Sequence, residues 1–206
     1  MQFDPADVRP SVFYQQMIHC IVPRPIAWVS TISAGGTTNV APFSYFTGVG
    51  SRPPRLLFCP ANTRQGGPKD TLRNIQDVGE FVVNIVPFGV AEKMNASAAD
   101  LDPEESEFEA CGLTAVGGLK VRAPRVAESP VQFECTRMQV LSIGEGPGGA
   151  NVVIGNVVHV HIDDAVIGAK DLVDPDLLDA VGRMGGITYC RTNQRFDLPR
   201  PVVDRL

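Results

Sequence analysis

The sequence predicts a mainly β domain, an antiparallel β-barrel of six strands with helices at its periphery. Short runs rich in β-branched and aromatic residues outnumber the helical stretches. Glycine and proline, 20 and 17 of the 206 residues, separate these runs by short turns. Strands that follow one another so closely favour an antiparallel barrel over a parallel sheet, which needs long crossovers. We therefore expect one domain over residues 1–206.

The first two strands are expected to form a hairpin around the turn Gly35-Gly36, with Pro42 at an edge or a bulge. In the last strand, alternating apolar residues are predicted to share one face: Val152, Ile154, Val158, Val160 and Ile162. The predicted strands are 26–32, 39–46, 55–59, 81–86, 131–143 and 151–162.

Helices are expected from 70 or 71 to 76, with Asp70 as the N-cap, and over 90–99 and 176–181. The acidic stretch 100–109 is predicted to be a solvated loop with a helical turn near Phe108.

Composition excludes several classes of protein. A net charge of −5 argues against general nucleic-acid binding, which needs clustered Lys and Arg. No run approaches the roughly 18 apolar residues of a membrane helix. The segment Met1–Pro5 has no basic stretch followed by an apolar one, so we expect no signal peptide and a cytoplasmic protein. The five scattered cysteines predict neither a disulfide framework nor a zinc site, but small buried hydrophobic side chains.

The segment 64–74 is the first candidate site. Lys69 supplies a positive charge, Thr71 a hydroxyl, and the first turn of the predicted helix unpaired N–H groups, which together suit a phosphate. Arg64 and the flexible pair Gly66-Gly67 would complete the site from the loop side. The alternative is an ordinary capped and solvated helix start.

The predicted hairpin is the second candidate site. Ser30, Thr31, Asn39 and Ser44 place hydroxyl and amide groups among apolar residues on neighbouring strands. A flat heteroaromatic ring with imide edges needs this mixture of apolar faces and a few donors and acceptors. The alternative is that these side chains satisfy turns or face solvent.

Ordered motifs connect the two candidate sites. Val22–Thr31 (VPRPIAWVST) followed by Asn39–Phe46 (NVAPFSYF) resembles the opening signature of flavin-reductase-like FMN-binding proteins, in the flavoredoxin branch. The likeness runs in order from about residue 14 to 200 and includes further stretches at 69–75, 80–84, 128–135, 155–161 and 182–189.

This resemblance implies an FMN-binding split barrel of antiparallel, Greek-key type, a homodimer, and FMN held without a covalent bond near the dimer interface. The cofactor-binding residues that it implies on the ring and ribityl side are Trp28, Val29, Ser30, Thr31, Asn39, Ala41 and Ser44. On the phosphate side they are Arg64, Lys69 and Thr71.

Four further residues are weaker candidates. His159 and His161, two apart on a strand, suit a metal site, a proton donor to the flavin, or simply a surface or interface. Two histidines lack the further ligands that zinc requires, so no metal is expected. Arg183 and Tyr189 are predicted either to approach the flavin or to lie in the dimer interface.

The resemblance implies an oxidoreductase in which NAD(P)H delivers hydride to FMN and electrons pass to a second flavin, a metal ion or a partner oxygenase. The isoalloxazine ring carries this chemistry, so no side chain is assigned a catalytic role. No GxGxxG motif follows a strand, so the nicotinamide would stack directly on the flavin. The alternatives are an FMN-binding electron carrier or sensor without appreciable NAD(P)H oxidase activity, and a barrel that binds haem or another flat cofactor.

Overall fold

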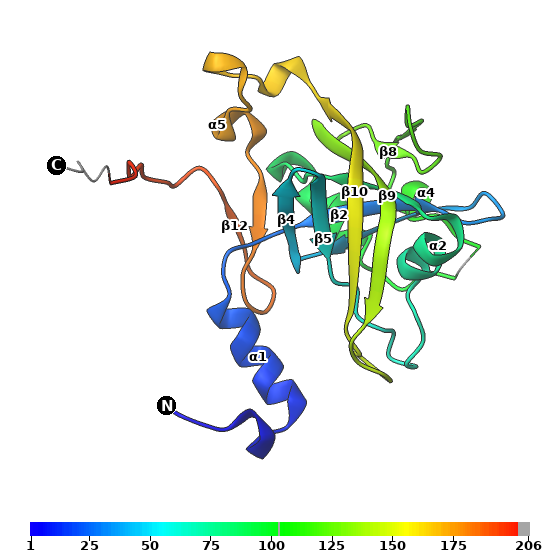
Figure 1. The fold of residues 1–206 in the computed structure, drawn as a ribbon, viewed down its shortest axis with the longest axis vertical. Coiled ribbons are helices and arrows are strands. Elements are labelled where there is room, and N and C mark those ends of the chain that lie inside the picture. Colours follow the sequence, from blue (N-terminus) through cyan, green and yellow to red (C-terminus); the bar gives the residue numbers. More distant parts are fainter. Residues whose placement is uncertain (103, 202–206) are drawn as a thin grey trace.

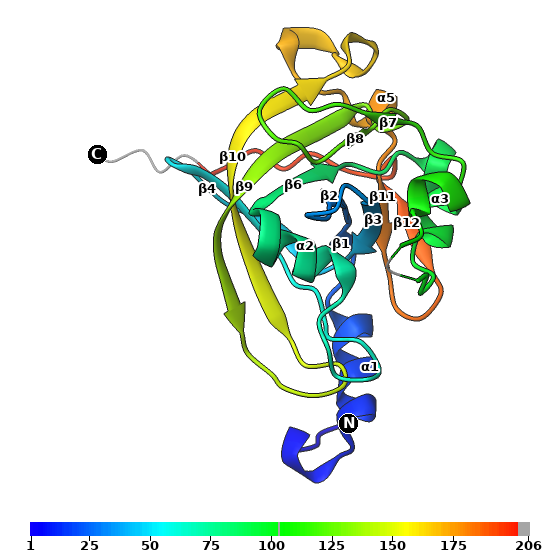
Figure 2. The ribbon, with the colours of Figure 1, turned by 90° about the vertical axis from the view of Figure 1, so that its right-hand side faces the viewer.

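The computed structural model describes residues 1–102 and 104–201 and confirms a mainly β architecture (Figure 1). The main sheet has seven antiparallel strands in the order β3-β2-β6-β9-β10-β5-β4. It curls around a core and carries helices on its outside (Figure 2). Its strands are β2 (Ala27–Ile32), β3 (Thr38–Phe43), β4 (Phe46–Ser51), β5 (Pro54–Phe58), β6 (Glu80–Asn84), β9 (Val131–Ser142) and β10 (Asn151–Ile162).

Two small sheets accompany the main one. The first has the order β1-β11-β12, built from β1 (Arg24–Pro25), β11 (Val181–Arg183) and β12 (Tyr189–Arg191). The second pairs β7 (Ala115–Val116) with β8 (Arg125–Val126).

The α-helices are short, and none among the described residues is long and apolar enough to cross a membrane. They are α1 (Pro10–Cys20), α2 (Asp70–Val78), α3 (Ala91–Ala96), α4 (Glu107–Ala110) and α5 (Pro175–Leu178). The part of the chain that the structure describes also contains four 3-10 turns: η1 (Pro5–Asp7), η2 (Phe88–Val90), η3 (Asp164–Val166) and η4 (Ala169–Asp171).

The core lies between the strands of the main sheet and one face of α2. Phe58 and Phe81 are fully buried there, with ring centroids 5.6 Å apart. Leu72 and Ile75 close this core from α2. Gly155 is required opposite Phe81, because a Cβ at that position would meet the aromatic ring. This packing fixes α2, and with it the start of α2, against the sheet.

The predicted hairpin is confirmed as β2 and β3, which pair with Val29 opposite Ala41. Pro42 lies on β3, which is an edge strand of the sheet, as its missing N–H requires. The predicted run 39–46 is divided, however. Its last residue begins a separate strand, β4, whose glycine-rich sequence carries no apolar pattern. The prediction of six strands was therefore one too few for the main sheet.

Several local predictions were wrong. Asp70 does not cap α2, because Lys69 occupies the N-cap position and the Asp70 carboxylate pairs with Arg73 at 2.6 Å. The helices predicted over 90–99 and 176–181 are shorter, and Val181 belongs to β11. Two register shifts interrupt the apolar face predicted along β10. Of the five cysteines only Cys135 is buried, and Cys20 is exposed at the end of α1.

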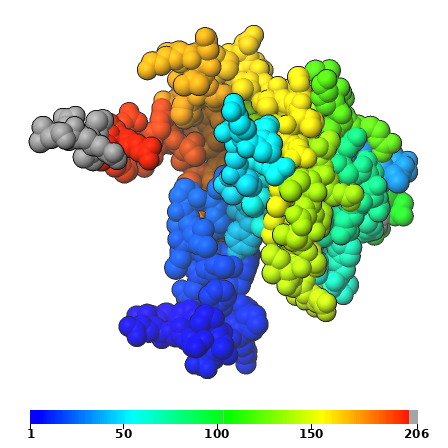
Figure 3. Space-filling model, viewed as in Figure 1, coloured from blue at the N-terminus to red at the C-terminus, as the bar shows by residue number. Residues whose placement is uncertain are grey.

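Helix α1 was not predicted, because its apolar residues do not face a core. Ile18 is its only buried residue, while Val12 and Tyr14 are 45% and 48% exposed. The helix stands away from the barrel, as Figures 1 and 3 show. Within residues 1–102 and 104–201, the apolar residues Val12 and Tyr14 of this helix are therefore largely exposed to solvent.

Candidate functional site

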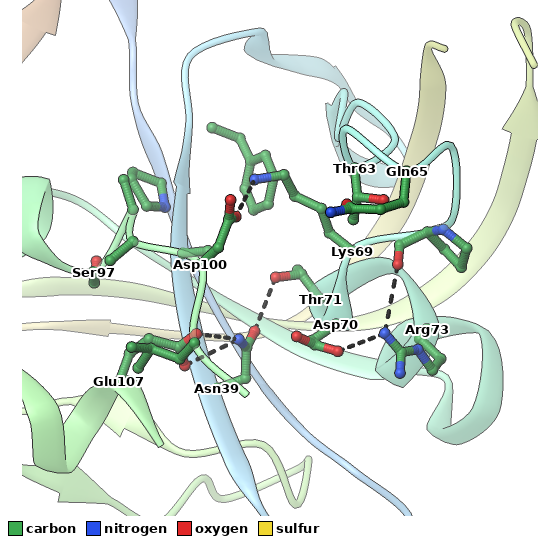
Figure 4. A pocket seen from close by; sticks show the side chains of 17 residues that line it. Asn39, Thr63, Gln65, Lys69, Asp70, Thr71, Arg73, Ser97, Asp100 and Glu107 are labelled. Carbon is green, nitrogen blue, oxygen red and sulfur yellow. Dashed lines mark hydrogen bonds and ion pairs between the residues drawn. The ribbon is translucent and has the colours of Figure 1, made fainter. Parts of the chain in front are cut away.

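A cavity of about 310 Å³ opens where the edge strand β3, the start of α2 and the segment between α3 and α4 meet (Figure 4). Its volume lies at the lower end of the range typical of small-molecule sites. The residues that line it are Asn39, Ala41, Pro42, Phe43, Thr63, Gln65, Pro68, Lys69, Asp70, Thr71, Arg73, Ser97, Ala98, Ala99, Asp100, Leu101 and Glu107.

The cavity brings the two candidate sites of the sequence together. Thr71, in the first turn of α2, donates a hydrogen bond to Asn39 Oδ1 on β3 at 2.9 Å. Lys69 lies immediately before this helix and Ala41 lies on the strand, and both line the cavity. The helix start and the hairpin are therefore direct neighbours.

A buried hydrogen-bond network forms the floor of the cavity. The amide of Asn39 donates to both carboxylate oxygens of Glu107, at 2.9 and 3.0 Å. Its oxygen accepts from Thr31 at 3.2 Å as well as from Thr71. Thr31 in turn accepts from Asn74 of α2 at 3.0 Å. The floor thus holds β2, β3, α2 and α4 in one arrangement, and Figure 4 shows the contacts of Asn39 with Thr71 and Glu107.

The sequence does not point to Glu107, because this residue lies in the acidic stretch 100–109, which is predicted to be solvated. Only 6% of this residue is exposed, and its carboxylate also accepts from the backbone N–H of Val40 at 3.1 Å. Burial, together with the charge of Asp70, raises the pKa of the Glu107 carboxyl, and the hydrogen bonds from Val40 and Asn39 act against that rise. Nothing in the acidic composition distinguishes this glutamate from its exposed neighbours.

The rim of the cavity carries the charges. Lys69 Nζ lies 3.9 Å from Asp100 Oδ1, and 37% of the lysine side chain is exposed. Asp70 and Arg73 form a closer pair, three residues apart on α2. The Lys69 ammonium group therefore lies at the cavity beside the first turn of α2. The backbone N–H groups of that turn have no hydrogen-bond partner within the helix.

The side chains of β2 do not line the cavity. Trp28 is fully buried in a second core cluster, and its indole N–H donates at 2.9 Å to Oγ of Ser97, a residue that lines the cavity. Val29 belongs to the core. Ser30 donates to the carbonyl of Pro124 and accepts from Asn84. Thr31 belongs to the hydrogen-bonded floor through Asn39 and Asn74, so these predicted residues support the cavity without lining it.

Ser44 and Arg64 also lie outside the residues that line the cavity. Ser44 accepts a long hydrogen bond of 3.4 Å from Arg24 Nε. The Arg24 guanidinium donates to the carbonyls of Ile18 and Met184 at 2.6 and 2.9 Å, and so connects α1 with the strand β11. The Arg64 side chain is exposed on the loop before α2.

The weaker candidates lie elsewhere. His161 Nε2 is 2.5 Å from a carboxylate oxygen of the fully buried Glu134, and the ring of His159 packs against that of His161. Arg183 stacks over the ring of Tyr189, whose hydroxyl donates to Asn95 at 3.0 Å. None of these side chains lines the cavity, and Glu134 was not anticipated as the partner of His161.

An antiparallel barrel with a cavity at its edge strand, a lysine at a helix start and an apolar wall of Ala41, Pro42 and Phe43 has the features of a site for a flat, phosphorylated cofactor. These features define a class of protein, a cofactor-binding β-barrel.

Comparison with known proteins identifies the family. The model for the flavin reductase like domain matches residues 18–188. The structure of nitrilotriacetate monooxygenase component B from Bacillus cereus is similar, with a TM-score of 0.91 and 30% identity over 96% of this chain and 98% of that one. The Pseudomonas fluorescens 2-nitrobenzoate 2-nitroreductase NbaA gives a TM-score of 0.87 and 30% identity, over 98% and 96% of the two chains.

Flavoredoxin of Desulfovibrio vulgaris shares the fold, with a TM-score of 0.74 and 21% identity over 86% of this chain and 91% of that one. The chain therefore belongs to the flavin reductase-like family of flavin-binding split-barrel proteins. The split-barrel fold that the motifs implied is thereby confirmed.

The Glu134 contacts predict a specific loss of stability in acid. Burial opposes ionisation of this carboxyl, but hydrogen bonds from His161 and from the backbone N–H groups of Leu119, Lys120 and Val121 outweigh it and lower its pKa to about 2. A carboxyl whose pKa is lower in the folded protein than in the unfolded chain stabilises the fold at every pH above its unfolded-chain pKa. We expect this contribution to the free energy of unfolding to be lost as the pH falls from about 5 to about 2.

Urea unfolding at a series of pH values checks this expectation. Glu134→Gln should be less stable than the original protein at neutral pH, and the difference should shrink in acid. Glu92→Gln, an exposed site on α3, is the control and should follow the original protein. A difference between Glu134→Gln and the original protein that stays constant down to about pH 2 would contradict the assignment.

Proposed function

We propose that this protein binds FMN non-covalently in the cavity and acts as an NAD(P)H-dependent flavin reductase. The observation that carries the proposal is the meeting of Lys69, at the start of α2, with the apolar wall of β3 in one cavity. A mononucleotide has an anionic end and a flat aromatic end, and the cavity offers a complementary surface to each.

The residues present fit this ligand. Lys69 and the N–H groups of the first turn of α2 would hold the phosphate. The hydroxyl proton of Thr71 is already donated to Asn39, so the Thr71 side chain would support the site and not donate to phosphate. Ala41, Pro42 and Phe43 would contact the ring, and the polar floor at Asn39 would lie beside the ribityl chain.

The bound flavin would supply the redox chemistry, accepting hydride from a nicotinamide and passing electrons onward. The chain's own residues bind and orient the ligand, and none is assigned proton transfer. The names of two similar proteins support two kinds of acceptor. A monooxygenase component B is consistent with a partner oxygenase, and a nitroreductase with a small molecule. A second flavin and a metal ion are the other acceptors that this reaction would serve.

We further propose that the protein is a cytoplasmic homodimer. The apolar residues Val158, Val160 and Ile162 of β10 are 39–43% exposed, and Val12 and Tyr14 of α1 are more exposed still. A second copy would remove this apolar surface from water, which stabilises the assembly.

Rapid mixing with NADH and with NADPH tests the proposed reaction. The purified protein is first denatured, and the flavin that it releases is identified. In the native protein loaded with FMN, we expect the visible flavin absorbance to bleach rapidly with one or both nucleotides. No bleaching over minutes would instead assign the protein as an electron carrier or sensor that a partner reduces.

Replacing the lysine tests the phosphate position. We expect Lys69→Ala to weaken FMN binding about ten- to a hundredfold, because a charge-assisted contact contributes about 1.5–3 kcal/mol. Riboflavin lacks the phosphate, and its affinity should not change. Fluorescence titration of both flavins measures the two affinities. Lys120→Ala, an exposed lysine away from the cavity, is the control. Equal losses for both flavins would contradict the assignment.

The mass of the protein in solution tests the dimer. Light scattering after size-exclusion chromatography should give twice the 22.1 kDa of one chain. Val160→Lys should shift the protein toward the monomer, because a charge would be buried in the interface. A monomeric mass for the unaltered protein would refute this proposal.

A further inference from the structure

The charged residues that line the cavity do not by themselves favour an anion, because the acids outnumber the bases. Lys69 and Arg73 face the acids Asp70, Asp100 and Glu107 around the same space. A ligand with a phosphate must therefore find its cation among groups that already have negative neighbours. The acid that a phosphate displaces most easily is the one with the weakest hydrogen bonds and ion pairs.

Two of the acids are held firmly. Asp70 is paired with Arg73 at 2.6 Å on successive turns of α2. Glu107 is buried and accepts three hydrogen bonds from Asn39 and the backbone of Val40. Neither carboxylate can leave its position without breaking short hydrogen bonds, and for Glu107 these are buried.

Asp100 is held loosely. Its contact with Lys69 is 3.9 Å long, at the limit of an ion pair, and 81% of its side chain is exposed. It lies on the segment that follows α3 and faces Lys69 across the mouth of the cavity (Figure 4). An exposed pair of this kind contributes only about 0.2–1 kcal/mol, so the carboxylate can turn into water at little cost.

We propose that Asp100 competes with the phosphate of the ligand for Lys69, and thereby sets how strongly the site prefers a phosphorylated flavin to an unphosphorylated one. This inference rests on the proposed function and deepens it. The carboxylate imitates the anionic end of the ligand, so the affinity for FMN includes the cost of displacing it. Riboflavin has no group that needs Lys69 and is indifferent to this contact.

Asp100→Asn is the direct test, because it removes the charge and keeps the shape. We expect FMN to bind about two- to fivefold more tightly and riboflavin to bind as before, the gain being what an exposed ion pair contributes. The gain should shrink at high salt, which screens exposed charges. A tighter complex is not a result that structural damage produces.

A control substitution and a double variant make the test specific. Asp102→Asn makes the same charge change at an exposed residue that does not line the cavity, and it should leave the FMN affinity unchanged. In a Lys69→Ala protein the gain from Asp100→Asn should be largely lost, because the two groups act on each other. An equal gain in the Asp102 variant, a full gain without Lys69, or a gain shared by riboflavin would each overturn the inference.

Failure of the proposed function is recognised separately. If the unaltered protein binds neither flavin, the flavin assignment fails. The competition for Lys69 is then read with inorganic phosphate, followed by the line width of its phosphorus resonance. Stronger broadening with Asp100→Asn than with the unaltered protein supports the inference, and equal broadening overturns it.

Discussion

The cavity depends on the buried side chain of Asn39, which forms hydrogen bonds with residues of three other elements. The amide of Asn39 gives its protons to Glu107 and receives those of Thr31 and Thr71. These partners come from β2, α2 and α4, which are far apart in the sequence. A buried polar group is costly when unpaired, so the four contacts specify one mutual arrangement of the three elements. The position of Lys69 beside the apolar wall follows from that arrangement.

Most of the fold could be predicted from the sequence, because its signals are local. Alternating and β-branched runs marked the strands, and Gly35-Gly36 marked the turn of the first hairpin. The failures have physical causes. Helix α1 presents apolar residues such as Val12 to solvent, so its pattern points to no core. Strand β4 is rich in glycine and is defined by its pairing with β5, which no local signal reveals.

The candidate site was only partly predictable. Lys69, Thr71, Asn39 and Ala41 were expected from their chemical types and from ordered motifs, and the structure places all four around one cavity. Glu107 and Asp100 were not, because their contacts bridge long separations in the chain and their acidic neighbours look the same in sequence. Ser30 was expected to contact a ligand, but a buried hydroxyl serves the backbone equally well, and here it donates to Pro124.

The guanidinium of Arg24 holds three separate segments of the chain together. It is 5% exposed and binds carbonyls of α1 and of Met184 after β11, together with the hydroxyl of Ser44, just beyond the strand that walls the cavity. A planar guanidinium that donates to three segments at once fixes them relative to one another, and a lysine in its place would lack this fork of donors. The C-terminal end of α1 is therefore fastened to the segments that follow β3 and β11, although the rest of the helix stands away from the barrel.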